Sequence, residues 1–203
     1  MDNLTIAILA GGKSARMGAG IDKTRVRILG RPLPAHIAAR LAGLGNETIL
    51  ITNQPDNHAA LGLRMYGDVW PGMGPLGGIY TALTHAQNTH TVVVAADMPF
   101  LNRDLLAHMA GLAPEVDVVV PRLAAGLEGL HAIYSKNCLA AIGARLKAGR
   151  RRIISFYDDV RVHYVDEGVI NRFDPEHLSF FNVNTLADLD TARHIAARQP
   201  PTT

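Results

Sequence analysis

Two kinds of segment alternate along the chain. Short runs that are apolar almost throughout predict strands buried on both faces. Segments with apolar residues three or four positions apart predict helices with one buried face. The expected strands are 4–9, 47–52, 91–97, 116–121 and 161–165, and the expected helices are 32–44, 74–86, 102–112, 135–149 and 185–198. A further short run, 130–134, is expected to pair beside the sheet.

Several residues predict where these elements begin and end. Three successive valines make 91–97 the clearest strand. Asn102 is expected to cap the helix that follows it, and Gly149 is expected to end the helix before it. Thr185 and Asp188 are spaced as in a capping box at the start of the last helix.

The alternation of strand and helix predicts an α/β protein. Right-handed crossovers would place helices on both faces of a mostly parallel sheet, giving three α/β/α layers. We expect a single domain over residues 1–198, with a frayed tail at 199–203. In such sheets ligands bind at the carboxyl ends of the strands, so polar residues directly after strands are the first candidates for function.

Composition and charge narrow the class of protein. The chain has 203 residues, 48% of them hydrophobic, and a formal net charge of +2, which argues against a nucleic-acid surface. No apolar run is long enough for a signal peptide or a membrane span, so we expect a cytoplasmic protein with no membrane partner. The single cysteine, Cys138, fits a reducing compartment and is interpreted as helix packing.

A glycine-rich basic loop follows the first strand, in the stretch "ILAGGKSARMGAGIDK" at 8–23. The Walker A spacing fails because Ala7 stands where a glycine is needed, and the dinucleotide fingerprint fails as well. Gly11 and Gly12 still allow a tight turn whose amides can bind an anion, and Arg16 and Lys23 add positive charge. The loop therefore indicates binding of a nucleotide's phosphates.

Polar residues follow three further apolar stretches. Asn53 follows 47–52, Asp68 follows "LRMYG", and Asp97 ends the valine-rich strand. A carboxylate at the end of a buried strand needs a partner to offset its desolvation, and Mg²⁺ bridging phosphate oxygens would supply one. Asp97 is therefore the candidate metal ligand.

The loop, with "LAGGKSARMG" followed by "DK", resembles the signature of nucleotidyltransferases, and the chain most resembles the molybdenum cofactor guanylyltransferase family. The resemblance extends from Leu4 to Ala192 and includes "WPGMGPLGGIYTAL", "AADMPFL", "LKAGRRRI" and "FFNVNTLADL". It implies a Rossmann-like nucleotidyltransferase fold and Mg²⁺-dependent transfer of GMP from GTP to the terminal phosphate of molybdopterin. It also implies transient contact with molybdoenzymes or their chaperones.

The resemblance assigns roles to individual residues. Main-chain groups at Leu9, Ala10 and Gly11 would hold guanine, with Asp68 as a further base contact, while the Leu9 side chain belongs to the core. The catalytic set would be Arg16, Lys23 and Asp97, with Asp97 binding the metal. The remaining nucleotide-binding positions would be Gly12, Asn53, Asn182 and Asn184, and the two asparagines face pyrophosphate, metal-bound water or the acceptor.

The acceptor side is indicated by the one dense basic run, Arg150 to Arg152, which suits a phosphorylated acceptor. Two features depart from the family pattern. Gly129 stands before Leu130 and His131 where related chains often have proline, and the spacing from Gly18 to Lys23 is one residue longer than the tightest form.

Two alternatives remain open on the sequence. The same loop would serve cytidylyl transfer to the pterin, or nucleotidyl transfer to a sugar or alditol phosphate. A non-catalytic nucleotide-binding protein of the same fold is the alternative from another class.

Overall fold

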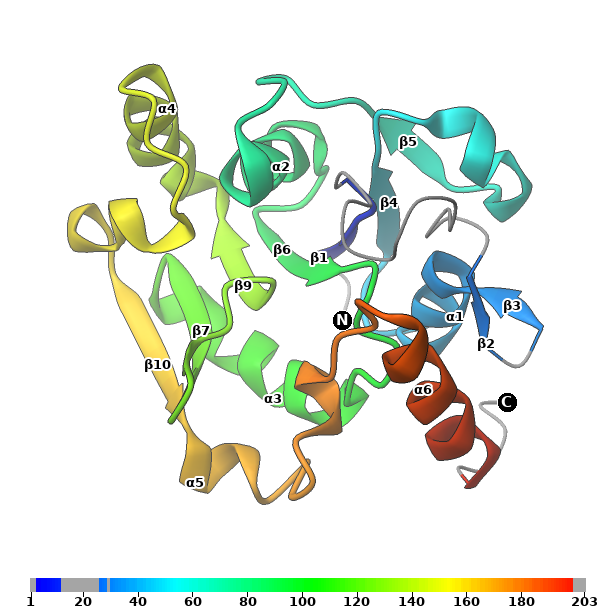
Figure 1. The fold of residues 1–203 in the computed structure, drawn as a ribbon. Helices are drawn as coiled ribbons and strands as arrows, with labels where there is room; N and C mark the ends of the chain where they lie inside the picture. The colour runs from blue at the N-terminus through cyan, green and yellow to red at the C-terminus, as the bar shows by residue number, and fades with distance from the viewer. Residues whose placement is uncertain (1–2, 12–25, 29, 199–203) are drawn as a thin grey trace.

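The computed structural model describes residues 3–11, 26–28 and 30–198. They form an eight-stranded sheet in the order β10-β7-β9-β6-β1-β4-β5, with β8 paired to β7 (Figure 1). The strands of this sheet are β1 (Leu4–Leu9), β4 (Glu47–Ile51), β5 (Arg64–Tyr66), β6 (His90–Ala95), β7 (Val118–Leu123), β8 (Gly126–Leu127), β9 (His131–Ser135) and β10 (Val162–Asp166). Strands β2 (Arg27–Ile28) and β3 (Arg31–Pro32) form a separate antiparallel pair.

Most of the sheet is parallel, as the alternation predicts. β1 pairs in parallel with β4 and β6, β4 with β5, and β7 with β10. The exception in the interior is β9, which is antiparallel to both β6 and β7. The expectation that 130–134 pairs beside the sheet is therefore wrong, because this strand lies between β6 and β7. Its residues are buried on both faces, which suits an interior position.

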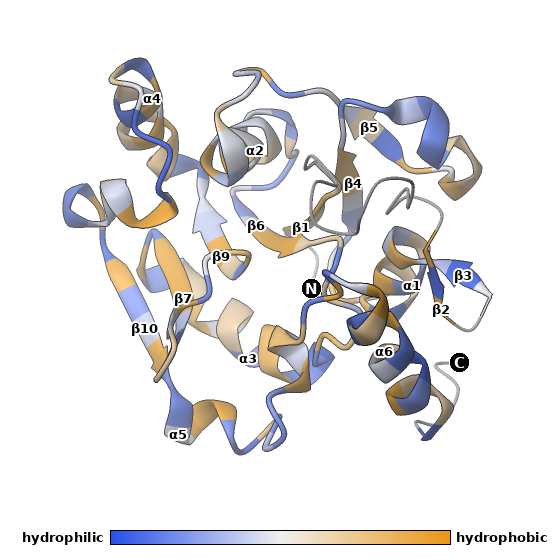
Figure 2. Ribbon diagram, viewed as in Figure 1, coloured by the Kyte–Doolittle hydropathy of each residue, from blue (hydrophilic) through white to orange (hydrophobic). Residues whose placement is uncertain are grey.

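Helices cover both faces of the sheet (Figure 1). On one face, Ile6 and Ile8 belong to a cluster with α1 (Leu33–Arg40) and α3 (Arg103–Leu112). On the other face, Ala7 and Leu9 pack in a second cluster with α2 (Gly74–His85) and α4 (Leu139–Lys147). In Figure 2 the hydrophobic colour covers much of β6 and β7, whereas β3 is hydrophilic. Successive residues of β1 thus pack against helices on opposite faces of the sheet, which gives the three-layer α/β/α fold.

A third apolar cluster attaches the C-terminal helix. α6 (Leu186–Arg198) packs Leu189, Ala192 and Ala196 with Val26 and Ile28 of the first hairpin region. Phe100 and Val183 belong to the same cluster. This packing brings the segment before α6 to the side of the sheet where β6 ends.

The expected helix boundaries are largely confirmed. Asn102 caps α3, since its Oδ1 accepts hydrogen bonds from the backbone N–H of Asp104 at 3.0 Å and of Leu105 at 2.9 Å. Thr185 and Asp188 form the expected reciprocal pair, with side-chain acceptors 3.1 Å and 2.7 Å from each other's backbone nitrogen. Helix α4 ends at Lys147, and Gly149 follows in the left-handed region at φ 69°, which favours glycine.

Some elements are shorter than expected or were not predicted. The first helix ends at Arg40, although Leu41 and Leu44 beyond it are buried as their spacing requires. The sequence pattern did not reveal β2, β3, β5, β8 or the short helix α5 (Glu167–Ile170). Within the described ranges, no helix combines the length and hydropathy needed to cross a membrane.

Candidate active site

Four parallel strands end at the same edge of the sheet, here called the carboxyl edge: β1, β4, β5 and β6. Backbone hydrogen bonds continue beyond the strand ends. The N–H of Ala10 donates to the carbonyl of Ile51 at 2.9 Å, and that of Ala96 donates to the carbonyl of Leu9 at 3.0 Å. The polar residues that follow these strands are therefore held along one edge, as the parallel arrangement predicts.

Ala10 and Gly11 follow β1 at this edge. The side chain of Leu9 is buried in the core, as predicted, and lies against α2, where a Cβ on Gly78 would be 3.1 Å from Leu9 Cδ1. Ala10 is half-buried and Gly11 is exposed, and no atom of the described residues lies within 4 Å of the position that a Cβ on Gly11 would take. The described part of the chain therefore does not cover the main chain at Gly11. Gly12, Arg16 and Lys23, and the tail 199–203, lie outside the described residues.

Asn53 and Asp68 are joined by two hydrogen bonds. The Asn53 side-chain amide donates to Asp68 Oδ2 at 2.8 Å, and Asn53 Oδ1 accepts from the Asp68 backbone N–H at 2.8 Å. The two residues follow neighbouring strands, β4 and β5. The structure thus brings these two sequence-predicted residues together, and it commits much of the Asn53 side chain to Asp68.

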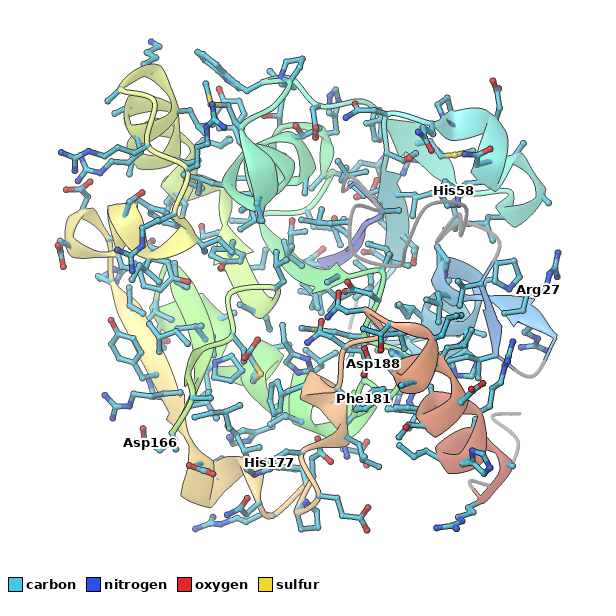
Figure 3. All side chains as sticks on the ribbon, viewed as in Figure 1. Arg27, His58, Asp166, His177, Phe181 and Asp188 are labelled. Atoms are coloured by element: carbon cyan, nitrogen blue, oxygen red, sulfur yellow. The ribbon has the colours of Figure 1, made fainter. Side chains whose placement is uncertain are left out.

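Asp97 lies beside the segment that carries the two predicted asparagines. The backbone N–H of Val183 donates to the carbonyl of Asp97 at 2.9 Å, so Asn182 and Asn184 flank a residue that is bonded to Asp97. The Asn182 amide donates to the carbonyl of Phe180 at 3.0 Å, and the Asn184 backbone N–H donates to Asp188 Oδ2 at 2.9 Å. Phe181 and Asp188, labelled in Figure 3, mark this segment where it leads into α6.

β6 ends at Ala95, two residues earlier than expected, and the half-buried Asp97 lies in the turn that follows. Among the described residues no group of three or more histidine, cysteine, aspartate or glutamate side chains could hold a metal ion. Mg²⁺ does not require such a cage, because it is commonly bound by one or two carboxylates together with water and substrate phosphates. A partly buried carboxylate of this kind is an oxygen ligand that suits that hard cation, so the chemistry of Asp97 fits the predicted role.

A loop from the second half of the chain reaches the same edge. The N–H of Ala95 donates to the carbonyl of Leu130 at 3.1 Å, which places the entry to β9 beside the end of β6. His131 is fully buried and its ring lies 4.9 Å from that of Phe180. Neither ring nitrogen has a hydrogen-bond partner within the described ranges, and burial lowers the pKa of His131 to about 4. The imidazole is therefore neutral at physiological pH.

The arginine run lies next to this loop. A Cβ on Gly129 would be 2.7 Å from Ile153 Cγ2, so the residue after the run packs directly on the turn before β9. The carbonyl of Gly129 also accepts the hydroxyl of Tyr134 at 2.8 Å. Arg150, Arg151 and Arg152 are themselves exposed. The structure thus packs the residue after the arginine run against the turn before β9, and Leu130 of that turn is bonded to Ala95 of β6.

Cys138 has the structural role expected of it. It is fully buried in the turn before α4, and its thiol donates to the carbonyl of Asp117 at 3.3 Å. Burial raises the pKa of the thiol to about 12, so the reactive thiolate is strongly disfavoured.

One polar contact of the site was missed by sequence reasoning. Thr81 is fully buried on α2, and its Oγ1 accepts a hydrogen bond from the backbone N–H of Val69 at 3.0 Å. A threonine within an apolar helix looks like ordinary packing in the sequence. Its spacing from Gly77 is the only signal, because a threonine four residues after a helical carbonyl can donate to it.

These features define a class of protein. A three-layer α/β/α fold with an exposed glycine after β1 and two carboxylates along the carboxyl edge is suited to bind a nucleotide and a metal ion. The model of one family, the MobA-like NTP transferase domain, matches residues 6–162.

Curated relatives and solved structures agree with this match. A "probable molybdenum cofactor guanylyltransferase" of Pelotomaculum thermopropionicum is 39% identical over 95% of this chain and 93% of its own. A "molybdenum cofactor guanylyltransferase" of Desulfosudis oleivorans is 32% identical over 95% of each chain. The crystal structure of molybdopterin-guanine dinucleotide biosynthesis protein A from Archaeoglobus fulgidus has a TM-score of 0.82 at 27% identity, covering 96% of this chain and 100% of its own. The chain belongs to the MobA-like NTP transferase family.

Proposed function

We propose that this protein transfers GMP from GTP to the terminal phosphate of molybdopterin. An oxygen of the acceptor phosphate attacks the α-phosphorus of GTP, the bond from that phosphorus to the β-phosphate oxygen breaks, and pyrophosphate leaves. The step is balanced without a nucleophile on the protein, so the protein contributes positioning and charge. One observation carries the proposal: Asp68 and Asp97 follow two strands that end at one edge, in a chain with 39% identity to the Pelotomaculum relative.

On the nucleotide side, the main chain at Leu9 to Gly11 and the carboxylate of Asp68 bind guanine. Guanine presents N1–H and a 2-amino group, both donors, and a carboxylate accepts from both. Adenine lacks this pair of donors in the same arrangement. Arg16 and Lys23 are assigned to the phosphates by the family resemblance, where fixed positive charge stabilises the charge that develops during transfer.

Asp97 would hold Mg²⁺, together with oxygens of the triphosphate, and Asn182 and Asn184 lie close enough in the chain to contribute to this region. When bound, the ion would offset the negative charge on the phosphate oxygens. The backbone carbonyl of Asp97 accepts the N–H of Val183, which holds the turn after β6 against the segment that carries the two asparagines.

The acceptor would bind beside Asp97, with its phosphate toward the arginine run 150–152. The exposed guanidinium groups give this side a positive charge, which suits an acceptor that carries a phosphate. We also propose that the protein is located in the cytoplasm. There it would make transient contact with the molybdoenzyme, or its chaperone, that receives the product.

The direct test measures pyrophosphate release with each of the four NTPs and Mg²⁺, with and without molybdopterin, and identifies the product by mass. We expect release with GTP only, and only when molybdopterin is present. Release with CTP would establish the cytidylyl alternative, and release with a sugar phosphate as acceptor would change the substrate class. Binding of GTP with no release under any of these conditions would favour a non-catalytic nucleotide-binding protein.

A further inference from the structure

The segment that carries Asp68 is held from two sides. Consecutive backbone N–H groups, those of Asp68 and Val69, donate to side chains from two different elements. Asp68 donates to Asn53 Oδ1, after β4, and Val69 donates to Thr81 Oγ1, on α2. Both partners are side chains of residues distant in sequence, so the position of this segment depends on them.

The hydroxyl of Thr81 can act only as an acceptor in its hydrogen bond with the Val69 backbone N–H. Its hydrogen is donated to the carbonyl of Gly77 at 2.9 Å, one turn earlier in α2. The oxygen must then act as the acceptor toward Val69. Because Thr81 is fully buried, water cannot replace this hydroxyl if it is removed.

Asn53 acts on the carboxylate itself. Its amide donates to Asp68 Oδ2, while its own oxygen holds the Asp68 backbone, so the two bonds fix both ends of the aspartate. Within the described residues, no hydrogen bond is made to Asp68 Oδ1. Asn53 thus orients the carboxylate through Oδ2, while Oδ1 and the second acceptor position of Oδ2 are left for a ligand with two donors.

We infer that Asn53 and Thr81 are positioning residues for base selection, and that both act through Asp68. This inference rests on the proposed function, in which Asp68 accepts hydrogen bonds from guanine. Two donors of a flat base can both meet one carboxylate only when it is correctly oriented, so a rotation of Asp68 weakens the contact with the 2-amino group. Asn53 and Thr81 prevent that rotation.

The experiment compares the dissociation constants of GTP and ITP, measured by calorimetry with Mg²⁺ on the full chain. ITP differs from GTP only by lacking the 2-amino group, so the ratio of the two constants reports that one contact. The ratio comes from a single protein preparation, which makes it insensitive to a fraction of misfolded protein. It also needs no acceptor, so an incorrect acceptor in the proposed function leaves this test intact.

We expect the wild type to prefer GTP over ITP, and Asp68→Ala to abolish that preference. Thr81→Val keeps the shape of the side chain but removes the acceptor, and we expect it to reduce the preference by about 3- to 10-fold, the scale of one hydrogen bond. Thr81→Ser keeps the hydroxyl and restores the preference. Thr84→Val is the matched control, because Thr84 is on the same helix and its exposed hydroxyl donates only to the carbonyl of Tyr80.

A double-variant comparison isolates the role of Asn53. If Asn53 acts through Asp68, then Asn53→Ala lowers the GTP preference alone but changes nothing further in the Asp68→Ala background. A further loss in that background would mean that Asn53 contacts the base directly, which overturns the inference. A wild-type preference that survives Thr81→Val and Asn53→Ala also overturns it. If Asp68→Ala keeps the preference, both the base contact of the proposed function and this inference are wrong.

Discussion

Gly129 and Ile153 approach so closely that no side chain larger than hydrogen fits at position 129 without movement. A Cβ there would lie 2.7 Å from Ile153 Cγ2 and 3.2 Å from the hydroxyl oxygen of Tyr134. We expect Gly129→Ala to lower the free energy of unfolding by about 1–3 kcal/mol, the usual cost of overpacking. Urea denaturation would measure the loss.

The same contact predicts a coupling between the two positions. Ile153→Ala opens the space that a methyl group at position 129 needs. The double variant should therefore lose less stability than the sum of the two single variants. Additive losses would contradict this coupling, because they would show that the turn before β9 accommodates the methyl group without movement of Ile153.

Replacing Asp97 should impair transfer far more than stability. We expect Asp97→Asn to lower kcat by about 100-fold or more, because the site loses the charge that holds the metal and phosphates. Asp158→Asn, at an exposed position away from the strand ends, should leave kcat unchanged. Equal kcat in Asp97→Asn and the wild type would remove Asp97 from the proposed metal site.

Replacing Asp68 by asparagine should redirect base preference. Xanthine has an oxygen where guanine has the 2-amino group, so the donor of an amide suits XTP and opposes GTP. We expect Asp68→Asn to lower kcat/KM for GTP by about 10- to 100-fold, and to raise that for XTP. Steady-state pyrophosphate release with the two nucleotides measures both. Loss of activity with both nucleotides to the same degree would argue against a base contact.

The arginine run should affect the acceptor and spare the nucleotide. We expect the triple replacement Arg150→Gln, Arg151→Gln and Arg152→Gln to raise KM for molybdopterin by about 10-fold while KM for GTP stays within twofold. Arg172→Gln, an exposed arginine beyond β10, serves as the control. An equal rise in both KM values would place the run on the nucleotide side instead.

His131 should make the fold sensitive to acid. Burial lowers its pKa to about 4 in the folded protein, against 6.5 for an exposed histidine, so between these values the unfolded chain binds a proton that the folded chain does not. The contribution of His131 to the free energy of unfolding is therefore fully present above pH 6.5. It falls by roughly 3 kcal/mol as the pH is lowered to 4. His131→Leu should flatten the dependence of the urea midpoint on pH in this range, whereas His163→Gln, on exposed β10, should not.

Much of the fold follows from local sequence pattern. β1 and β6 are predicted because a run of apolar residues is buried whichever face it presents, and α3 because Asn102 marks its start. The pairing of β9 could not be predicted in the same way. An apolar run such as "LHAIY" fits an edge or an interior strand equally, and only the packing of the whole sheet decides between them. β2 and β3 have two residues each, too few to show a period.

In the candidate site, too, some features could be predicted from local sequence and others depend on tertiary packing. The placement of Asn53 and Asp97 at the carboxyl edge could be predicted, because polar residues after buried strands meet at one edge of a parallel sheet. The pairing of Asn53 with Asp68 could not, since it depends on β5, whose three residues carry little signal. Thr81 and the contact of Gly129 with Ile153 join segments far apart in the sequence, and no spacing along the chain encodes them.

The reversed direction of β9 places its first residues, rather than its last, beside the carboxyl end of β6. In the proposed function, the ends of β1, β4, β5 and β6 would therefore serve the nucleotide, and the turn entering β9, with the residues after α4, would serve the acceptor. The turn lies outside the paired residues of β9, so its sequence can change without altering the register between β9 and β6. On the proposed function, acceptor choice could then change while the nucleotide side of the edge stays as it is.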